Sequence, residues 1–91
     1  MTVRLSGRLI CTSAAEAAVV ARHLPAHVAL TRAEPGCLSF AVTRSADPLV
    51  WQVEESFTDR AALAAHQART QGSEWFAQTR QIIRDVTMTE D

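Results

Sequence analysis

The residues best suited to chemistry in this sequence are His66, Glu55 and Arg80. An imidazole changes charge near neutral pH, so His66 is a candidate general base that removes a proton from a bound substrate. Arg80 follows Phe76 by one helical turn and could hold the anion that such a proton transfer leaves. Glu55 is either a second acid or base group with a raised pKa or a buried carboxylate paired with an arginine. These types of side chain predict proton abstraction followed by stabilisation of an anion.

Aromatic side chains could enclose this chemistry in a dry, apolar space. The candidate walls are Phe40, Trp51, Phe57, Trp75 and Phe76. A place in the core is the alternative for all five, and it is the more usual role of periodic aromatic positions. His66 and Arg80 also have plainer alternatives, as a helix-end residue bonded to a carbonyl and as a solvated side chain.

A metal site is not expected on the first predicted helix. His23 and His27 are four residues apart, a spacing that can bind zinc. Pro25 lies between them, and Glu16 and Arg22 indicate that this face of the helix is solvated. Because no third ligand is evident, the sequence predicts no bound metal.

The elements that must position these residues begin with a strand and a helix. Alternating apolar residues predict a strand from Val3 to Cys11. A capping box formed by Ser13 and Glu16 starts a helix, in which Pro25 predicts a kink and a second short segment to about residue 33.

The second half of the chain reads as a hairpin, two helices and a last strand. Two largely apolar strands follow the turn Glu34-Pro35-Gly36, and Asp59 is a plausible N-cap for a helix that ends near residues 71–72. Leu63 and His66 share the face of this helix that should look toward the sheet. Ser73 can cap a further helix over residues 74–84, and a short strand over residues 85–90 ends the chain.

This order predicts one α+β domain over residues 1–91, with a ferredoxin-like βαββαβ antiparallel sheet and helices on one face. Bulky apolar residues occur at both odd and even positions of the hairpin strands. We therefore expect an apolar open face of the sheet, which a second copy covers in a homodimer.

Composition excludes two classes of partner. The formal net charge is −1, and nine arginines without a lysine form no basic run, so no nucleic-acid surface is expected. The sequence has neither an apolar run of membrane length nor a signal-peptide pattern, so we expect no membrane association and a cytoplasmic location. Cys11 and Cys37 lie in separate predicted strands and read as small core residues.

Three motifs resemble the antibiotic biosynthesis monooxygenase family, which includes quinol monooxygenases. They are Glu34-Pro35-Gly36-Cys37-Leu38 with Phe40, then Glu55-Ser56-Phe57, then Ala62-Leu63-Ala64-Ala65-His66. Their order and spacing are more specific than each motif alone, and the resemblance covers nearly the whole chain. It implies a small dimeric α/β barrel with a cavity between sheet and helices.

The resemblance also implies a function: oxidation of a small quinol, phenol or polyketide-like aromatic by O₂ without a cofactor. The alternative is a non-catalytic ligand-binding or stress-response barrel, because one fold hosts many functions. The sequence departs from relatives in having no Tyr and no Asn, and Gln71 stands where many relatives have a second His. Haem degradation, which uses Asn, is therefore not expected.

Overall fold

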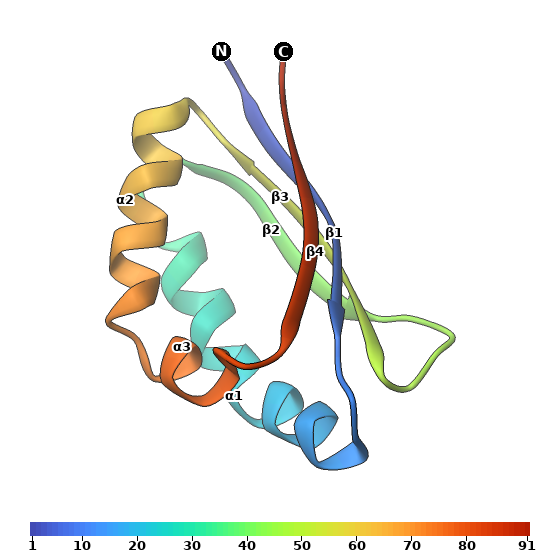
Figure 1. Ribbon diagram of the computed structural model, residues 1–91. Helices are drawn as coiled ribbons and strands as arrows, with labels where there is room; N and C mark the ends of the chain where they lie inside the picture. The colour runs from blue at the N-terminus through green and yellow to red at the C-terminus, as the bar shows by residue number, and fades with distance from the viewer.

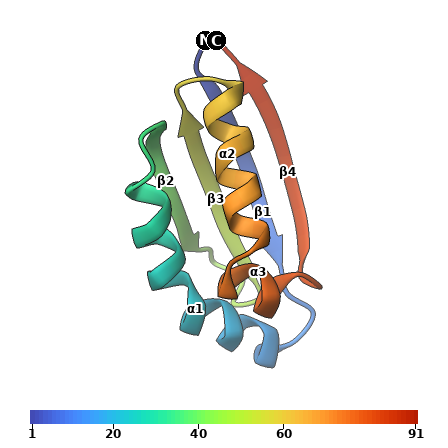
Figure 2. The ribbon, with the colours of Figure 1, turned by 90° about the vertical axis from the view of Figure 1, so that its left-hand side faces the viewer.

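The fold is a four-stranded antiparallel sheet with three helices on one face (Figures 1 and 2). The computed structural model describes residues 1–91. Its elements are β1 (Val3–Ile10), α1 (Ala14–Arg32), β2 (Cys37–Arg44), β3 (Val50–Phe57), α2 (Arg60–Gln71), α3 (Glu74–Thr79) and β4 (Ile83–Glu90). The strand order β2-β3-β1-β4 is that of a ferredoxin-like sheet, as the sequence predicts.

Short polar side chains start all three helices. The Oγ of Ser13 accepts from the N–H of Glu16, Asp59 accepts from Ala62, and Ser73 accepts from Phe76. Each cap satisfies one of the backbone donors that a helix leaves free at its N-terminus. The three predicted helix starts are therefore confirmed.

Two predicted boundaries in the helical regions are wrong. The last helix ends at Thr79 instead of residue 84, and β4 already begins at Ile83. Ile82 is buried while Ile83 pairs with Ile10 in the sheet, so this apolar pair fits the alternation of a strand as well as a helical face. Pro25 does not split α1, which is one continuous helix whose axis bends along its length (Figure 2).

The open face of the sheet is less apolar than the sequence predicts, and in β2 one reason is a β-bulge that reverses the alternation there. Cys37 lies opposite Phe57 and Ser39 lies opposite Ser56, so the bulge falls at Leu38. Cys37 thus packs on the helix side with Phe57, although its position differs in parity from that of Phe40, which is buried on the same side. The face away from the helices carries mainly polar side chains, which are Arg4, Ser6, Arg8, Thr43, Gln52, Glu54, Asp85, Thr87 and Thr89.

Two clusters of buried residues fill the two ends of the space between sheet and helices. The larger joins α1 to the sheet and includes Trp51 and Trp75. The smaller consists of Val3, Phe57 and Leu63, with Cys37 packed against it. Close backbone approach tightens the sheet at Gly7, where an added Cβ would lie 2.0 Å from the carbonyl oxygen of Asp85.

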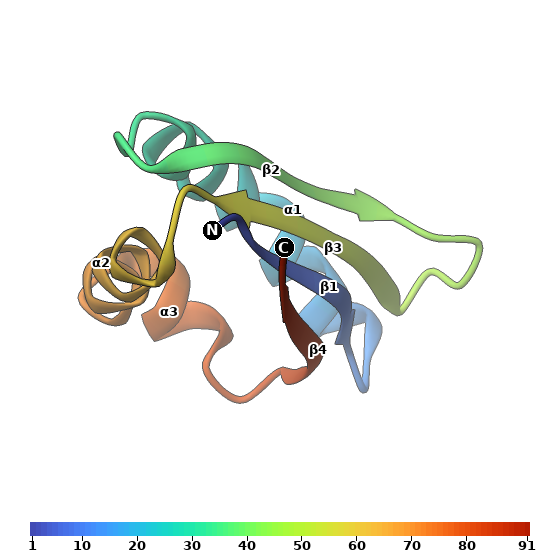
Figure 3. The same cartoon turned by 90° about the horizontal axis from the view of Figure 1, so that it is seen from above.

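The two chain ends lie side by side at one end of the sheet (Figures 1 and 3). The N–H of Asp91 donates to the carbonyl oxygen of Thr2 at 3.0 Å. At the opposite end, the loop between β2 and β3 projects beyond the helices (Figures 1 and 3). None of the helices has the length and apolar character that crossing a membrane would require.

Candidate functional site

A cavity of about 460 Å³ lies between the sheet and the helices, in the region between the two core clusters. Leu5, Leu9, Val53 and Val86 contribute apolar lining from three strands. The polar groups of the lining include His27 of α1, Glu55 of β3 and His66 of α2. The cavity therefore has an apolar surface with a few titratable groups that converge on it, which is the usual composition of a ligand site.

His66 is fixed by a carboxylate outside the cavity lining. His66 is 6% exposed, and its Nδ1 lies 2.8 Å from Oε1 of Glu34, which begins the turn Glu34-Pro35-Gly36 after α1. Arg69, one turn further along α2, donates to the other oxygen of Glu34 at 2.8 Å and to Thr31 at 2.9 Å. Burial alone would raise the pKa of Glu34, but the hydrogen bonds from Arg69 and His66 outweigh it and lower that pKa. An ionised Glu34 accepts from Nδ1–H, which leaves the Nε2 lone pair of His66 free.

Glu55 stands on the other side of the same imidazole. Its Oε1 lies 3.8 Å from Nε2 of His66, beyond hydrogen-bond distance, and its side chain is 13% exposed. Burial, together with the charge of Glu34, raises the pKa of Glu55 to about 7, although Arg84 opposes the shift. Of the two alternatives, the raised-pKa environment is present, and no arginine forms an ion pair with this carboxylate.

His27 is a second buried imidazole in the cavity lining. It is 4% exposed, stacks on Trp75 with 4.7 Å between ring centroids, and meets Phe40 edge-on at 5.3 Å. Burial, followed by the nearby His66 and Arg69, lowers the pKa of His27 to about 4, so the ring is neutral at pH 7. The expectation that this part of α1 is solvated is wrong for His27.

The five predicted wall residues separate into two groups. Phe40, Trp75 and Phe76 line the cavity. Phe57 lies behind His66, with 5.0 Å between the ring centroids, and packs in the smaller core cluster. Trp51 belongs to the larger cluster, and the guanidinium of Arg44 lies over its ring at 4.5 Å.

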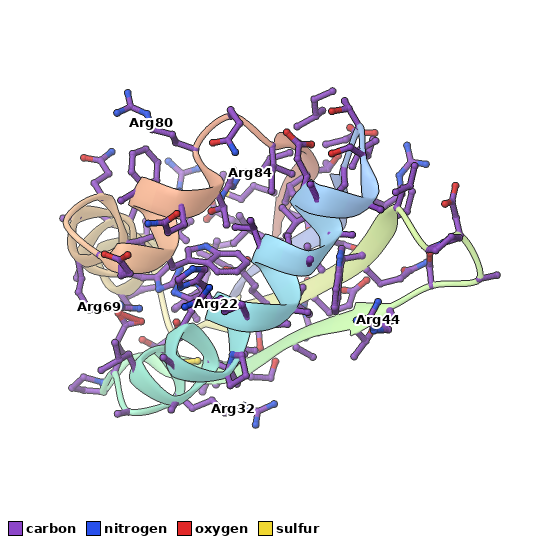
Figure 4. All side chains as sticks on the ribbon, turned by 90° about the horizontal axis from the view of Figure 1, so that it is seen from below. Arg22, Arg32, Arg44, Arg69, Arg80 and Arg84 are labelled. Atoms are coloured by element: carbon purple, nitrogen blue, oxygen red, sulfur yellow. The ribbon has the colours of Figure 1, made fainter.

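Arg80 and Arg84 occupy different places relative to the cavity (Figure 4). Arg80 is exposed, projects away from the helices, and has its guanidinium 5.8 Å from the ring of Phe76. Arg84 reaches the cavity lining from β4. Its guanidinium donates to the carbonyl oxygens of Thr79 and Ile82 and to Oγ1 of Thr79, so it is largely engaged in closing the end of α3.

Comparison with known proteins places this chain in a family. The sequence profile described as antibiotic biosynthesis monooxygenase matches residues 7–78, which is most of the chain. The chain belongs to the antibiotic biosynthesis monooxygenase family. None of the curated proteins matches the sequence at a significant level.

Solved structures share the fold of this family member over almost its full length. Rv0793 from Mycobacterium tuberculosis is 28% identical, with a TM-score of 0.72, and the match covers 98% of this chain and 91% of that one. PA3566 from Pseudomonas aeruginosa is 26% identical, with a TM-score of 0.64 and coverage of 97% and 87%. A candidate antibiotic biosynthesis monooxygenase from Deinococcus radiodurans is 24% identical, with a TM-score of 0.77 and coverage of 100% and 92%.

Sequence reasoning missed three groups around the cavity of this family member: Glu34 as the partner of His66, Arg69 as the partner of Glu34, and His27. A signal for His27 exists in the sequence. The buried positions of α1 are Ala17, Val20, Leu24, His27 and Thr31, which follow the three- and four-residue spacing of one helical face. Glu34 gave no such signal: it belongs to the predicted turn and to one motif of the family resemblance, and neither predicts a contact with His66.

The arrangement suits proton transfer at an enclosed aromatic ligand. His66 has one nitrogen tied to a carboxylate and the other facing Glu55, and aromatic rings bound the same space. No three or more His, Cys, Asp or Glu side chains are grouped so that they could hold a metal ion. Proton transfer and ligand orientation are therefore what these side chains can supply.

Proposed function

We propose that this protein is a monooxygenase that oxidises a small quinol, phenol or polyketide-like aromatic with O₂ and uses no cofactor of its own. Membership of the family supports a monooxygenase reaction. The observation that carries the proposal is the cavity in which Nε2 of His66 and the carboxylate of Glu55 face each other at 3.8 Å. A ligand hydroxyl at hydrogen-bond distance from both groups would have two proton-handling side chains beside it, which supports the proposal.

The reaction balances without an external reductant. Loss of the hydroxyl proton gives an electron-rich phenolate, which transfers one electron to O₂ to form superoxide and a ligand radical. The two radicals combine in a carbon–oxygen bond, and the resulting hydroperoxide loses water as a ring C–H proton departs. One oxygen atom of O₂ becomes the new carbonyl of the quinone, and the other leaves as water.

Each side chain has a definite part in this scheme. His66 takes the hydroxyl proton at Nε2, and Glu34 stabilises the imidazolium through Nδ1–H. Glu55, whose pKa is raised to about 7, is available as acid or base near neutral pH and returns a proton to the departing oxygen. Phe40, Trp75 and Phe76 exclude water from the phenolate and orient the ring.

Oxygen consumption with a panel of hydroquinones, phenols and anthrones tests the proposal. We expect O₂ uptake by the wild type that falls by roughly a thousandfold in kcat/KM in His66→Ala, as removal of a general base does. His23→Ala is the matched control, because His23 lies on α1 outside the cavity lining. Equal background O₂ uptake by the wild type and His66→Ala on every substrate would refute the proposed oxygenase activity.

A ligand-binding protein without oxygenase activity is the second candidate. The absence of Tyr and Asn from the sequence favours it, since this removes two side chains that relatives use on their substrates. In that case the same phenols bind, with no O₂ consumed and no difference between His66→Ala and His23→Ala in oxygen uptake.

The proposal includes a homodimer in the cytoplasm. Val50, Ile10 and Ile83 are neighbours in the register of three strands and form a short apolar stripe across one end of the open sheet face. We expect a species of twice the 10.0 kDa chain mass in sedimentation at micromolar concentration, and a shift toward the monomer in Ile83→Glu. A wild-type species of single-chain mass would contradict the dimer.

The support for the proposed cytoplasmic location is that both cysteines are free, which is consistent with a reducing compartment.

A further inference from the structure

His27 is the one buried titratable group of the cavity that the proposed reaction leaves without a part. It is more than nine-tenths buried, and its Nδ1 has no hydrogen-bond partner. The neighbouring network that joins Thr31, Arg69, Glu34 and His66 does not include it. Nδ1 is enclosed, and no protein group bonds to Nε2, so Nε2 is the nitrogen that a ligand in the cavity can reach.

The surroundings of the ring fix its orientation and its proton. Trp75 covers one face of His27 at an interplanar angle of 6°, and Phe40 abuts the ring at 80°. A proton on the enclosed Nδ1 would be a donor with no acceptor, so the tautomer with the proton on Nε2 is favoured. His27 therefore lines the cavity as a hydrogen-bond donor held in one plane.

The donor His27 lies close to the proposed base His66. The ring centroids of His27 and His66 are 5.9 Å apart. One ligand oxygen at about 2.8 Å from each of two nitrogens can bridge nitrogens up to about 5.6 Å apart, a separation that this centroid distance allows. The oxygen that loses its proton to His66 can thus accept a hydrogen bond from His27.

The arginines around the cavity are less suited to this task. Arg69 is bonded to Glu34 and Thr31, and Arg84 is bonded to Thr79 and Ile82. Arg80, the residue expected from the sequence to hold the anion, projects away from the cavity lining. Arg69 and Arg84 are thus bonded to other protein groups, and Arg80 lies outside the cavity lining.

We propose that His27 donates a hydrogen bond from Nε2 to the phenolate oxygen of the ligand and so stabilises the anion that His66 generates. This inference rests on the phenol-binding cavity of the proposed function, and it assigns to α1 the anion partner of that site. The low pKa of His27, about 4, agrees with a role as a neutral donor throughout the physiological pH range.

Anaerobic titration with 4-nitrophenol tests the assignment without any oxygenase turnover. The nitrophenolate absorbs in the visible, so its affinity and the pKa of the bound phenol are read directly, and nitrobenzene serves as the uncharged analogue. In His27→Phe, which keeps an aromatic ring against Trp75, we expect about tenfold weaker binding of nitrophenolate and unchanged binding of nitrobenzene. His27→Gln, which restores an N–H donor, should recover most of this loss, and the matched control His23→Phe should bind as the wild type does.

A measurement on the wild type keeps the test valid if a variant fails to fold. ¹⁵N spectra of the imidazole at pH 7 should show the proton of His27 on Nε2, with a shift of that signal when nitrophenolate binds. An Nδ1–H tautomer, no shift on binding, or an unchanged nitrophenolate to nitrobenzene ratio in His27→Phe would overturn the inference. If the wild type bound no nitrophenol at all, the proposal that this cavity binds phenols would be overturned as well. Binding that depends on His27 without O₂ uptake would leave this inference standing and refute only the oxygenase.

Discussion

Glu54 and Glu55 are consecutive residues of β3, and they lie in opposite environments because strand side chains alternate between faces. Glu54 is exposed on the open face, where it accepts from the hydroxyl of Ser6 at 2.7 Å. Glu55 points toward the helices, faces His66, and has its pKa raised to about 7. The comparison teaches that cover by the helices, and not residue type or position along the chain, makes one of these carboxylates a candidate for chemistry.

The same contrast extends to the two faces of the sheet. On the open face, charges pair in contact with solvent, as Arg4 does with Asp91, both of whose side chains are more than half exposed. On the helix side, the two carboxylates around His66 are each less than one-fifth exposed. Water therefore screens the interactions between charged side chains less on the helix side than on the open face. For that reason, removing a charge should change activity and stability most on the helix side.

The largest expected difference is in oxygen consumption. Glu55→Gln removes the ionisable group beside His66, and we expect a loss of about a hundredfold in kcat/KM, typical of a lost acid or base. Glu54→Gln makes the same chemical change one residue away and should leave the rate within about twofold. Comparable losses in both variants would break the contrast between the two faces.

The second difference is in the pH dependence of stability. The pKa of Glu55 is about 7 in the folded protein, against an ordinary 4.5, so folding takes up a proton between these pH values. The stability linked to this group is thus full below pH 4.5 and is lost as the pH rises through 7. Relative to the wild type, Glu55→Gln should gain about 3 kcal/mol of unfolding free energy between pH 4.5 and pH 8, in urea titrations.

The control for this measurement is Glu54→Gln, whose pH profile should run parallel to that of the wild type. His27 contributes with the opposite sign, because its lowered pKa makes stability fall as the pH drops from 6.5 toward 4. For that reason the difference between Glu55→Gln and the wild type, and not the wild-type profile alone, isolates Glu55. A constant difference across this pH range would show that Glu55 is not desolvated.

The smallest effect is expected on the open face. A double-mutant cycle on Arg4 and Asp91 should give a coupling below about 1 kcal/mol, because both side chains are solvated. The coupling should fall further in 0.5 M NaCl. A larger coupling between Arg4 and Asp91 that grows with protein concentration would mean that a second chain covers this end of the sheet. Both faces of the sheet would then be buried, and the comparison would be between two buried environments.

Local signals predicted the fold well. Ser13, Asp59 and Ser73 marked helix starts that depend only on nearby backbone groups, and the order of elements then left few topologies. The errors arose where a pattern served two structures. Residues 82–84 fit either a helical face or a strand. The bulge at Leu38 changed the face of a neighbouring residue, although Leu38 itself is neither a glycine nor a proline.

The site was predictable to the extent that a single element fixes it. His66 could be placed on the cavity side from its spacing to Leu63 within α2, and Glu55 from its parity with Trp51. Glu34 could not be placed in this way, because its role comes from a contact with α2, which is distant in the sequence. Helical spacing places His27 on the buried face of α1, but it does not predict the contact with Trp75 of α3. Arg80 and Arg84 show the same limit, since an error of a few residues in the end of α3 changes which arginine reaches the cavity.

The hydrogen bond between the two chain ends has a consequence for protein engineering. A short linker from Asp91 to Met1, with new ends opened in the loop between β2 and β3, gives a circular permutant that begins with β3 and ends with β2. In that chain Glu55 and His66 would be synthesised before His27 and Glu34, while their neighbours in space stay the same. The permutant therefore separates the order in which the site is made from the geometry with which it acts.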